Sequence, residues 1–577
     1  MNNTQIAELL RNVAASYQYK DPIKYKFQII AYNRAADSIE HATSELKDLW
    51  DDGKLDDVPS IGVSIAKHLD ELFRTGKSKH FEDLMKDIPK EAFILMALPK
   101  IGLKTALRLI AQGKPDEVKR LLKDAEKLKA KNKRLLLPYA ENLALEVIEW
   151  IKKSEYVENV DVLGSLRRRS ATVGDIDILA APKNSKTQKI HTKGGYFNSK
   201  LIEHFTKYPK AQKIIEAGDT TASLLLPNNV QVDLLVMDSE AYGNALQHFT
   251  GSKFHNIALR EHAKKLGYSL NEYGVKKANS GQRIANRFKT EEELYEFLGL
   301  RYIEPELRED AGEIESSLNN SLPNLVKLED IKADLQIHSN FDIETSHDLG
   351  VSTMEEIIEK ASQLGYEYIA FTEHNPSKKG HTNQQKINLI KQKSEAIEQL
   401  NYSRESNSEK RIPKVFNSLE IDINKDGSLP LPDKAFDFLD FTLVSIHGVF
   451  DLSRFDQTKR VINALSYPKV KIFAHPTARK INEREGVELD WEKIFDFCLK
   501  NNKWIEINAD PMRLDLPDTL VRDAVKLGVK LTLGTDTHEV SMMNNMKYGV
   551  DVARRGWAEK KNIINTRSLK EFEEMLQ

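Results

Sequence analysis

The sequence predicts a multidomain protein with an α-helical N-terminal part, an α+β module in the middle and an α/β domain at the C-terminal end. Three patterns favour this fold class. Apolar residues recur at helical spacing through residues 1–150. Short alternating runs at 175–179 and 230–236 are typical of strands. From residue 331 onward, β-like runs alternate with helical patterns, which predicts a parallel, distorted β/α barrel.

Composition limits the classes of protein to which the chain can belong. With 577 residues, it has room for roughly four domains. Charged residues make up 30% of it, yet the formal net charge is only −2. This excludes a globally basic nucleic-acid binder, so any such contact must come from local patches. The single cysteine, Cys498, excludes a disulfide framework and a Cys-based zinc site, and it suits a reducing compartment.

Targeting and membrane signals are not evident in the sequence. Residues 1–8 lack a basic region followed by an apolar core, so they do not form a signal peptide. No run approaches the roughly 20 apolar residues that are needed to span a bilayer. We therefore expect a soluble, cytoplasmic protein without membrane contact.

Two similar pieces stand out in the helical part. Val-Pro-Ser-Ile-Gly at 58–62 and Leu-Pro-Lys-Ile-Gly at 98–102 each place a glycine, Gly62 or Gly102, at a tight turn before a helix. Such a turn leaves backbone amide groups free for an anion. The pieces resemble the helix-hairpin-helix motif, which implies sequence-independent binding of a DNA phosphate, with a monovalent cation at the motif. A plain helix–turn–helix corner is the alternative, but two copies in one chain favour DNA binding.

Residues 164–179 carry the strongest functional signal. Residues i and i+2 of a strand point the same way, so Asp175 and Asp177 share one face. Adjacent carboxylates repel each other and are stable mainly when divalent cations lie between them. The strand-like run at 230–236 carries a third carboxylate, Asp233. Three carboxylates on adjacent strands can hold two Mg²⁺ ions for in-line phosphoryl transfer, whereas the plain alternative is a solvated strand edge.

The residues before the two carboxylates favour the phosphate-transfer site. Gly164 and Ser165 let backbone N–H groups approach a phosphate, and Arg168 supplies a charged fork for it. The whole pattern, Gly-Ser-x-Arg-Arg-x(5)-Gly-Asp-x-Asp, resembles the palm of family X DNA polymerases, the family of DNA polymerase beta. Arg169 departs from the pattern, since the family often has Gly there.

The resemblance implies a DNA-templated DNA polymerase that uses two Mg²⁺ ions. Asp175 and Asp177 would bind both ions. Asp233 would bind the catalytic ion and help to activate the primer 3′-hydroxyl. The residues that would hold the incoming triphosphate are Gly164, Ser165, Arg168 and Gly174.

The block after these strands is similar to the thumb of the same family. It contains His-Phe-Thr-Gly-Ser at 248–252, where the family has Tyr-Phe-Thr-Gly-Ser. The change from Tyr to His leaves discrimination against ribonucleotides open. The resemblance also implies that Arg260 and Glu272 position the template strand. The residues that it places against the incoming nucleotide are His248, Phe249, Gly251 and Asn256.

Two features of the helical part bear on DNA end processing. Relatives of DNA polymerase beta carry a lysine in the helix after the first hairpin, which removes 5′-deoxyribose phosphate through a Schiff base. That position is His68 here, and Lys67 lies about 100° around the helix, which argues against lyase activity at this site. Residues 120–134 hold seven basic and two acidic side chains. Such a run either tracks DNA phosphates or forms a solvated helix face.

The C-terminal β/α pattern places potential metal ligands just past the ends of its strands. Parallel α/β barrels have their functional sites at these ends. A single such His would more often be structural, but several together indicate a metal site. The residues are His338, His374, Glu420, His447, His475, Asp536 and His538.

This arrangement resembles the polymerase-and-histidinol-phosphatase (PHP) domain that is joined to family X polymerases. The resemblance implies nine ligands for three metal ions, Mn²⁺ or Zn²⁺, and 3′→5′ exonuclease or phosphoesterase chemistry. Gln336 stands where the family has His, and Ile343 stands where it has Asp, unless Asp342 or Glu344 fills that position. Because an amide oxygen is a poor substitute for imidazole, we expect at least one metal ion to be weakened. The sequence leaves open whether this module is an active nuclease or only structural.

The order of these modules gives the predicted organisation and function. We expect a monomer that binds gapped or primed DNA and dNTPs, associates with the nucleoid when it is on DNA, and fills short gaps in base excision or end joining. The predicted domains are a lyase-like subdomain at 1–85, fingers at 86–150, a palm at 151–242, a thumb at 243–310, a linker at 311–332 and a PHP domain at 333–577.

Three other functions fit parts of the sequence. In the first, the C-terminal module is the main 3′→5′ exonuclease and the N-terminal half delivers DNA to it, but Gln336 and Ile343 argue against this. In the second, the chain is a template-independent nucleotidyltransferase, a class that shares Gly-Ser and Asp-x-Asp. The paired hairpins and the thumb block favour a templated enzyme. In the third, the chain is a gap-binding scaffold, which would make the three aspartates dispensable.

Overall fold

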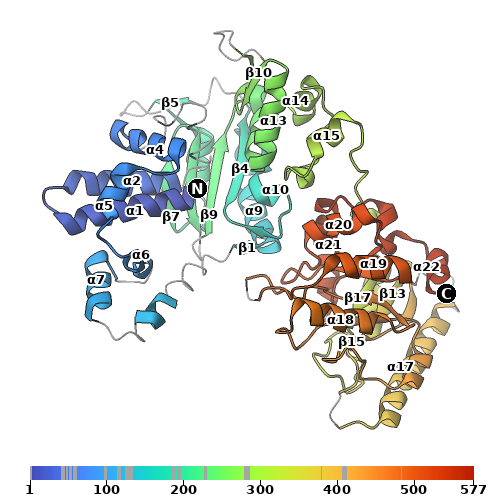
Figure 1. Ribbon diagram of the computed structural model, residues 1–577. Helices are drawn as coiled ribbons and strands as arrows, with labels where there is room; N and C mark the ends of the chain where they lie inside the picture. Colours follow the sequence, from blue (N-terminus) through green and yellow to red (C-terminus); the bar gives the residue numbers. More distant parts are fainter. Residues whose placement is uncertain are drawn as a thin grey trace. The chain divides into compact units, whose positions relative to one another are not determined.

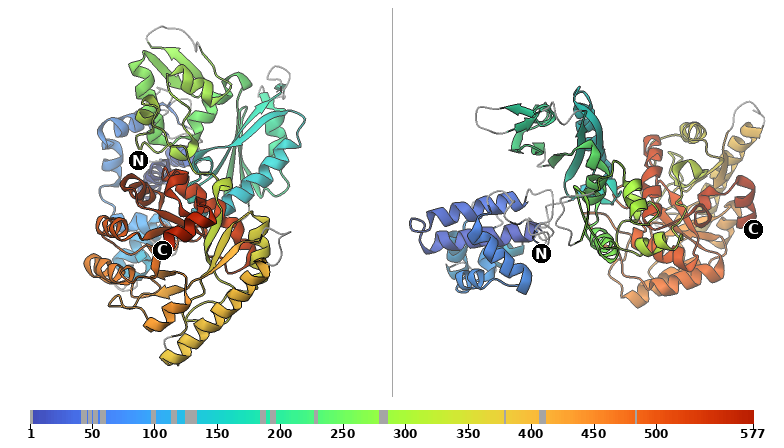
Figure 2. Two further views of the ribbon diagram at one scale, coloured as in Figure 1. Left: turned by 90° about the vertical axis from the view of Figure 1, so that its right-hand side faces the viewer. Right: turned by 90° about the horizontal axis from the view of Figure 1, so that it is seen from above.

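The computed structural model describes most of the chain. Figures 1 and 2 show its helices and strands coloured along the sequence. The described residues fall into two compact units, Met1–Arg134 with Pro209–Leu234, and Leu135–Tyr208 with Leu235–Gln577. The residues that the structure describes are 3–40, 46, 50, 55, 61–96, 101–112, 118–123, 134–183, 189–191, 197–226, 230–278, 286–377, 380–405, 412–482 and 484–577.

The first unit is mainly helical, which confirms the predicted class of the N-terminal part. Ile6, Leu10 and Val13 recur at helical spacing on its first helix and are fully buried in one apolar core. Strands β7 (Lys213–Ala217) and β8 (Thr221–Leu226) of this unit pair antiparallel. The helices are α1 (Asn3–Lys20), α2 (Lys26–Glu40), α4 (Val63–Thr75), α5 (Lys79–Met85), α6 (Lys90–Leu95) and α7 (Leu103–Gln112).

The second unit begins with short antiparallel pairs. In the pair of β2 with β4, Val162 lies opposite Ile178, and in the pair of β1 with β3, Leu136 lies opposite Thr172. β5 and β6 form a third pair. The strands and helices are β1 (Leu135–Leu136), α9 (Leu137–Lys152), β2 (Val157–Val162), α10 (Gly164–Arg167), β3 (Thr172–Val173), β4 (Ile176–Pro182), β5 (Lys189–His191), β6 (Phe197–Ser199) and α11 (Lys200–Thr206). β9 (Val230–Val236) carries residues of both units.

A helical segment follows and buries its own apolar core, which includes Leu259, Leu294 and Tyr295. The predicted linker at 311–332 contains a helix whose Glu313 is fully buried, because His255 and two backbone amides satisfy its carboxylate. The elements are η3 (Ser239–Ala241), α12 (Tyr242–Thr250), α13 (Lys253–Lys265), β10 (Tyr268–Asn271), β11 (Gly274–Lys277), α14 (Glu291–Phe297), η4 (Pro305–Leu307), α15 (Glu313–Leu318) and η5 (Leu328–Asp330).

The C-terminal part has the predicted alternation of parallel strands and helices. Its strands form a three-stranded sheet, β12-β13-β14, and a five-stranded sheet, β15-β16-β17-β18-β19. Parallel bridges His374–Glu420 and Ile337–Thr537 lie between the strands of the two sheets. The described strands do not form one continuous ladder, so a closed barrel stays a prediction. The strands are β12 (Ala333–Ile337), β13 (Tyr368–Phe371), β14 (Lys414–Asn417), β15 (Glu420–Asp422), β16 (Thr442–Ser445), β17 (Val470–Phe473), β18 (Trp504–Asn508) and β19 (Leu531–Gly534).

Helices surround these strands in both figures. Phe441, Trp504 and Phe572 are fully buried in their common core. No helix among the described residues is long and apolar enough to cross a membrane. The helices are α16 (Met354–Gln363), α17 (Asn383–Glu405), η6 (Asp433–Phe438), α18 (Arg454–Leu465), α19 (Trp491–Asn501), α20 (Asp518–Leu527), η7 (Val540–Asn545), α21 (Met546–Arg555), η8 (Lys560–Asn562), η9 (Ile564–Thr566) and α22 (Leu569–Leu576).

Candidate functional site

The two neighbouring carboxylates lie at the start of β4. Ile176 and Ile178 are fully buried, whereas Asp175 is exposed and Asp177 is half-buried. This alternation follows from the period of two residues in a strand. The strand therefore presents its carboxylates on the face opposite the buried isoleucines.

Gly164 lies directly against Asp177. Its φ of +57° is in the left-handed region, which L side chains rarely adopt. A Cβ added at Gly164 would stand 2.9 Å from Oδ2 of Asp177, which is closer than real contacts of this kind. The backbone N–H of Leu163 also donates to the carbonyl oxygen of Asp177 at 2.8 Å. Glycine is therefore required at this position for its backbone conformation and for the close approach of the carboxylate.

Asp233 lies on β9 and is 4% exposed. The side-chain amide of Gln231 donates to both of its carboxylate oxygens, at 3.0 and 2.9 Å. Asp233 belongs to the first unit, whereas Asp175 and Asp177 belong to the second. A site that contains all three carboxylates stays a prediction.

Arginines follow the glycine turn, and the first two bind carboxylates of the segment after β11. Arg167 forms a two-point ion pair with Glu291, at 2.9 and 2.6 Å. Arg168 donates to Glu309 at 2.9 Å and to the carbonyl oxygen of Thr250 at 2.6 Å. The predicted phosphate ligand Arg168 is thus already held by an anion, and a triphosphate would share its guanidinium with Glu309.

Glu291 is the centre of a buried ion-pair network. It is 2% exposed and accepts hydrogen bonds from Arg167 and from Arg308, which is fully buried. Burial alone would raise the pKa of Glu291, but Arg308 and Arg167 outweigh burial and lower this pKa to about 2. No local motif predicted the network, because its members are far apart in the sequence.

The turn at 248–252 lies beside the arginines. Gly251 has a φ of +67°, and a Cβ there would stand 3.3 Å from Nη1 of Arg168. Asn256 uses its side chain inside the protein, where Nδ2 donates to the carbonyl oxygen of His248 at 2.7 Å. Its Oδ1 accepts from Gln247 at 2.8 Å. Asn256 therefore holds this turn in the structure, and its predicted contact with a base edge stays a prediction.

The other predicted nucleotide and template residues lie nearby in the sequence. The rings of His248 and Phe249 meet edge to face, with centroids 4.9 Å apart. Arg260 lies on α13, Glu272 lies in the turn between β10 and β11, and both are half-buried. Ser165 lies in α10 before the arginines, and Gly174 is exposed between β3 and β4 after them.

The two hairpin glycines stand at helix starts. Gly62 precedes α4 and Gly102 precedes α7, and a Cβ at either position would meet no atom of the described residues within 4 Å. Each glycine thus stands before a helix start, where backbone N–H groups can bind an anion. Residues 58–60 and 98–100, which complete the motifs, lie outside the described residues, as does 124–133 of the basic run.

His68 occupies the position where a lyase would need a lysine. Its ring stacks on that of His80, with centroids 4.2 Å apart. Burial lowers the pKa of His68, and the neighbouring His80 lowers it further. Lys67, about 100° around the same helix turn, is exposed. An imidazole supplies no primary amine for Schiff-base chemistry.

The seven predicted metal ligands of the C-terminal part come together, with Glu420 at the centre. The Glu420 carboxylate lies 2.7 Å from Nε2 of His475 and 3.3 Å from Nε2 of His447. It also lies 3.3 Å from Nε2 of His338 and 3.7 Å from Nδ1 of His374. Glu420 thus contacts imidazoles that come from four different strand ends.

His338 joins the remaining ligands to this centre. Its Nε2 lies 3.3 Å from Oδ1 of Asp536, and its ring stacks on those of His374 and His538 at centroid distances of 4.5 and 4.4 Å. Ligand atoms of His338, Glu420 and Asp536 all lie within 4.8 Å of one another, as do those of His338, His374 and His538. Such spacings suit a shared cation.

Several imidazole nitrogens of this cluster are buried and lack a hydrogen-bond partner in the described part of the chain. They are the Nδ1 atoms of His338, His374 and His475. Buried polar atoms are normally satisfied, so these nitrogens fit a bound metal ion. Burial lowers the pKa of His374 well below its ordinary value, which keeps the neutral form that ligates metals.

Electrostatics also keep the central carboxylate ionised. Burial by itself would raise the pKa of Glu420. The imidazoles of His374, His475 and His447 outweigh burial and hold this pKa well below its ordinary value. An ionised carboxylate surrounded by imidazole nitrogens is a ligand set that suits a divalent transition-metal ion.

The two altered ligand positions have different structural outcomes. The amide of Gln336 donates to Glu420 at 2.8 Å and accepts from Asn508 at 3.2 Å, so it orients the central carboxylate. Ile343 is fully buried. The two exposed alternatives for this ligand position make other contacts. Oδ1 of Asp342 accepts a hydrogen bond from the backbone N–H of Glu344, and the Glu344 carboxylate forms an ion pair with His381. Neither Asp342 nor Glu344 is seen among the metal-ligand groups of the described residues.

Two further residues of the cluster were missed by sequence reasoning. Asp422 lies 2.9 Å from Nε2 of His347 and 2.9 Å from Nδ1 of His447. These three side chains form a further group with metal-ligand spacing. The i, i+2 rule applied to Glu420 on β15 would have found Asp422, whereas His347 lies in an irregular segment without such a signal.

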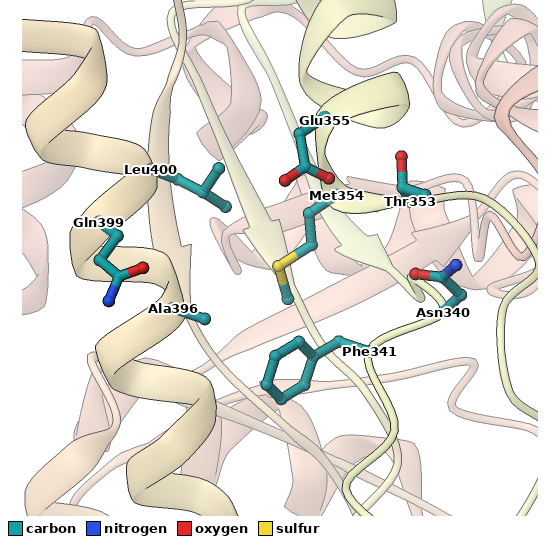
Figure 3. A pocket seen from close by; sticks show the side chains of 8 residues that line it. All are labelled: Asn340, Phe341, Thr353, Met354, Glu355, Ala396, Gln399 and Leu400. Atoms are coloured by element: carbon teal, nitrogen blue, oxygen red, sulfur yellow. The ribbon is translucent and has the colours of Figure 1, made fainter.

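A cavity of about 360 Å³ lies beside the segment that carries His338. Figure 3 shows Phe341 and Met354 facing Ala396 and Leu400 of α17 across it. Its lining contains no imidazole, and Glu355 is its only acidic residue among those described. The cavity is therefore separate from the metal-ligand cluster.

Two family models match parts of the chain. The model described as DNA polymerase beta thumb matches residues 245–309, and the model described as helix-hairpin-helix domain matches residues 1–78. The first range contains the turn at 248–252 and Glu291. The second contains Gly62 and His68.

Known proteins are similar to the whole chain and to parts of it. The DNA polymerase/3′-5′ exonuclease PolX of Bacillus subtilis (strain 168) is 30% identical over 603 residues, which cover 100% of both chains. A probable phosphatase of Thermoanaerobacter sp. (strain X514) is 24% identical over 227 residues, which cover 37% of this chain and 84% of the phosphatase. DNA polymerase lambda of Arabidopsis thaliana is 24% identical over 339 residues, which cover 53% of this chain and 62% of that polymerase.

Proposed function

Since this chain belongs to the family X DNA polymerases and is a DNA-directed DNA polymerase, we propose that it fills short gaps during base excision or end joining. The observation that carries the proposal is the contact between Gly164 and Asp177 at the start of β4. It joins a phosphate-binding turn to a strand that exposes two carboxylates. The helix starts that follow Gly62 and Gly102 support binding of the DNA backbone next to a gap, with a monovalent cation at each motif.

The residues of this site fit divalent metal ions. Asp175 and Asp177 present carboxylate oxygens on the solvent side of β4, and oxygen is the ligand that Mg²⁺ prefers. These two residues would hold both Mg²⁺ ions, with Asp233 as a further ligand of the catalytic ion. When bound, the two ions would lower the cost of the charge that develops on the attacking and leaving oxygens.

The remaining residues would position the substrates. Ser165 and Arg168 would hold the triphosphate beside the turn, while Gly164 and Gly174 let the backbone approach it. His248, Phe249 and Gly251 would face the sugar, and Asn256 would set the turn that carries them. Arg260 and Glu272 would position the template. The predicted domain boundaries, from the lyase-like subdomain at 1–85 to the PHP domain at 333–577, and a monomeric state are part of this proposal.

Substrate preference tests the gap-filling function. Primer extension by the wild type in Mg²⁺ is compared on a one-nucleotide gap with a 5′-phosphate, on an open primer–template and on a single-stranded primer. We expect kcat/KM to be highest on the gap and no extension of the single strand. Equal rates on the gap and the open template would contradict gap filling. Extension of the single strand would favour template-independent transfer.

A second function is favoured by the cluster around Glu420. We propose that it holds Mn²⁺ or Zn²⁺ and removes nucleotides from 3′ ends as a phosphoesterase. The unpartnered nitrogens of His338, His374 and His475 support this. His347 and Asp422 add a group with metal-ligand spacing around His447, while Gln336 and Ile343 supply no metal ligand of the expected type. When bound, the ions would polarise the phosphate that is attacked.

Metal content tests the second function independently of activity. Wild type, His475→Ala and the control His262→Ala are dialysed against Mn²⁺ and then metal-free buffer, and bound metal is measured by mass spectrometry. His262 lies outside the cluster and binds the carbonyl oxygen of Leu298. We expect a loss of bound Mn²⁺ and of primer shortening in His475→Ala alone. A wild type that retains no metal and shortens no primer would make the module structural.

A further inference from the structure

Helix α21 of the C-terminal part presents one polar face to residues 167–169, the arginine segment of the polymerase site. Its residues Lys547, Tyr548, Asp551, Arg554 and Arg555 follow an i, i+1, i+4, i+7, i+8 pattern, which defines one face of a helix. Every one of them makes a polar contact with residues outside the C-terminal part. The opposite side of α21 is buried, and a Cβ added at Gly549 would stand 2.9 Å from Ala509.

The central contact is the ion pair between Asp551 and Arg169. Nε and Nη2 of Arg169 lie 2.9 and 2.7 Å from the Asp551 carboxylate. Nη1 of the same arginine donates to Glu141 of α9 at 2.6 Å. Glu141 also accepts from Lys547 and Tyr548 of α21, at 2.8 and 2.9 Å. Arg169 thus connects α9 and α21 through charge-assisted hydrogen bonds.

A second contact reaches the backbone of the predicted triphosphate ligand. Nη1 of Arg555 donates to the carbonyl oxygen of Arg168 at 2.7 Å and to Glu309 at 3.0 Å. Glu309 is also the carboxylate that holds the Arg168 guanidinium. Arg555 is fixed in turn by Asp518 at 2.7 Å. α21 therefore contacts both the main chain and the anionic partner of Arg168.

Arg169 adopts a backbone conformation that glycine would adopt more readily. Its φ is +58°, and a non-glycine residue in this region costs roughly 1 kcal/mol. A residue is retained in such a conformation when surrounding interactions determine it. The side-chain contacts of Arg169 with Glu141 and Asp551 supply those interactions.

We propose that α21 positions the arginine segment of the polymerase site, with Asp551 and Arg555 as positioning residues for nucleotidyl transfer. The C-terminal module then contributes to polymerisation through this helix, independently of its metal-ligand cluster. The inference rests on the proposed role of Arg168 as a triphosphate ligand. Its consequence is specific, since loss of the contacts should weaken use of the dNTP more than binding of DNA.

The test is a double-mutant cycle on Asp551→Asn and Arg169→Gly, with gap filling measured as a function of dNTP concentration. In the wild-type background, we expect Asp551→Asn to raise KM for the dNTP about tenfold, since a hydrogen bond to a charged group of this kind is worth about that factor. A smaller change is expected in kcat and none in the Kd for gapped DNA. In the Arg169→Gly background, the glycine adopts the loop conformation without strain and Asp551 has lost its partner, so Asp551→Asn should change KM no further.

Asp496→Asn is the matched control, because it breaks an exposed ion pair with Lys500 on α19 that lies within the C-terminal part. Bound Mn²⁺ measured on the same preparations reports whether each variant retains a folded C-terminal module. An unchanged KM in Asp551→Asn, or an equal rise in both backgrounds, would overturn the positioning role. A wild type without gap filling would instead overturn the proposed function, so the two failures are distinguishable.

Discussion

Glu291→Gln removes the charge at the centre of the buried network that joins Arg167 to Arg308. The network lowers the pKa of Glu291 from 4.5 to about 2. That difference corresponds to about 3 kcal/mol of stabilisation at neutral pH. The substitution also leaves the fully buried Arg308 without its carboxylate, and breaking a buried pair typically costs about 3–5 kcal/mol. We expect Glu291→Gln to lower the free energy of unfolding by an amount within this range at pH 7.5.

The pH dependence of the loss has a definite sign. Because the pKa of Glu291 is lowered by folding, its contribution is fully present above the unfolded value of 4.5 and disappears as the pH falls through about 2. At pH 3.5, the ionised carboxylate contributes about 2 kcal/mol. The difference in unfolding free energy between wild type and Glu291→Gln should therefore shrink by about 1 kcal/mol between pH 7.5 and pH 3.5.

Pulse proteolysis in urea measures this difference in unfolding free energy. It reports the fraction of protein in which residues 245–309, the range matched by the thumb model, resist cleavage at each urea concentration. Glu292→Gln is the matched control, because Glu292 is exposed on the same helix turn. We expect the control to unfold at the wild-type urea concentration. A loss below about 1 kcal/mol for Glu291→Gln, which is the range of surface ion pairs, would refute the reasoning. A loss of the same size at both pH values would refute it too.

Three further predictions follow from other parts of the structure. Gly164→Ala should lower gap-filling kcat/KM at least tenfold in steady-state assays, because the new Cβ meets Asp177 and the left-handed backbone adds roughly 1 kcal/mol; wild-type kinetics would contradict this. Phe572→Ala should cost about 3–5 kcal/mol in urea unfolding, because its ring is fully buried against Tyr368; a loss below about 1 kcal/mol would show that α22 is not part of the core. Chelation followed by Mn²⁺ addition should lower and then restore the melting temperature of the C-terminal part, since a ligand at a hundred times its Kd stabilises by about 2.7 kcal/mol; a melting temperature that ignores both treatments would argue against a bound metal.

Local patterns in the sequence predicted those features that depend on neighbouring residues. The period of two at Ile176 and Ile178 placed both isoleucines in the core, and the structure confirms their burial. The alternation of strands and helices after residue 331 predicted parallel strands, because such strands need crossover helices. The same rule placed the potential metal ligands at strand ends, where Glu420 gathers four imidazoles.

Long-range partners could not be predicted in this way. Arg167 and Glu291 are 124 positions apart, and no local pattern pairs them. Polar composition predicted a linker at 311–332, but Glu313 is buried because His255, distant in sequence, satisfies it. The contact of Arg169 with Asp551 spans 382 positions. The sequence therefore showed that Arg169 replaces the family's usual glycine, but it did not show the contact that Arg169 makes.

The most direct test of the polymerase site is single-turnover extension of a one-nucleotide gap in Mg²⁺ by wild type and Asp177→Asn. Asp219→Asn serves as control, since Asp219 is exposed in the turn between β7 and β8. The carboxylates of β4 are proposed to hold the metal ions, so Asp177→Asn should lose at least a thousandfold in rate, as expected when several kcal/mol of charge stabilisation are removed, while it still binds gapped DNA with wild-type affinity. Extension by Asp177→Asn at the wild-type rate would contradict the assignment of the catalytic site to this strand.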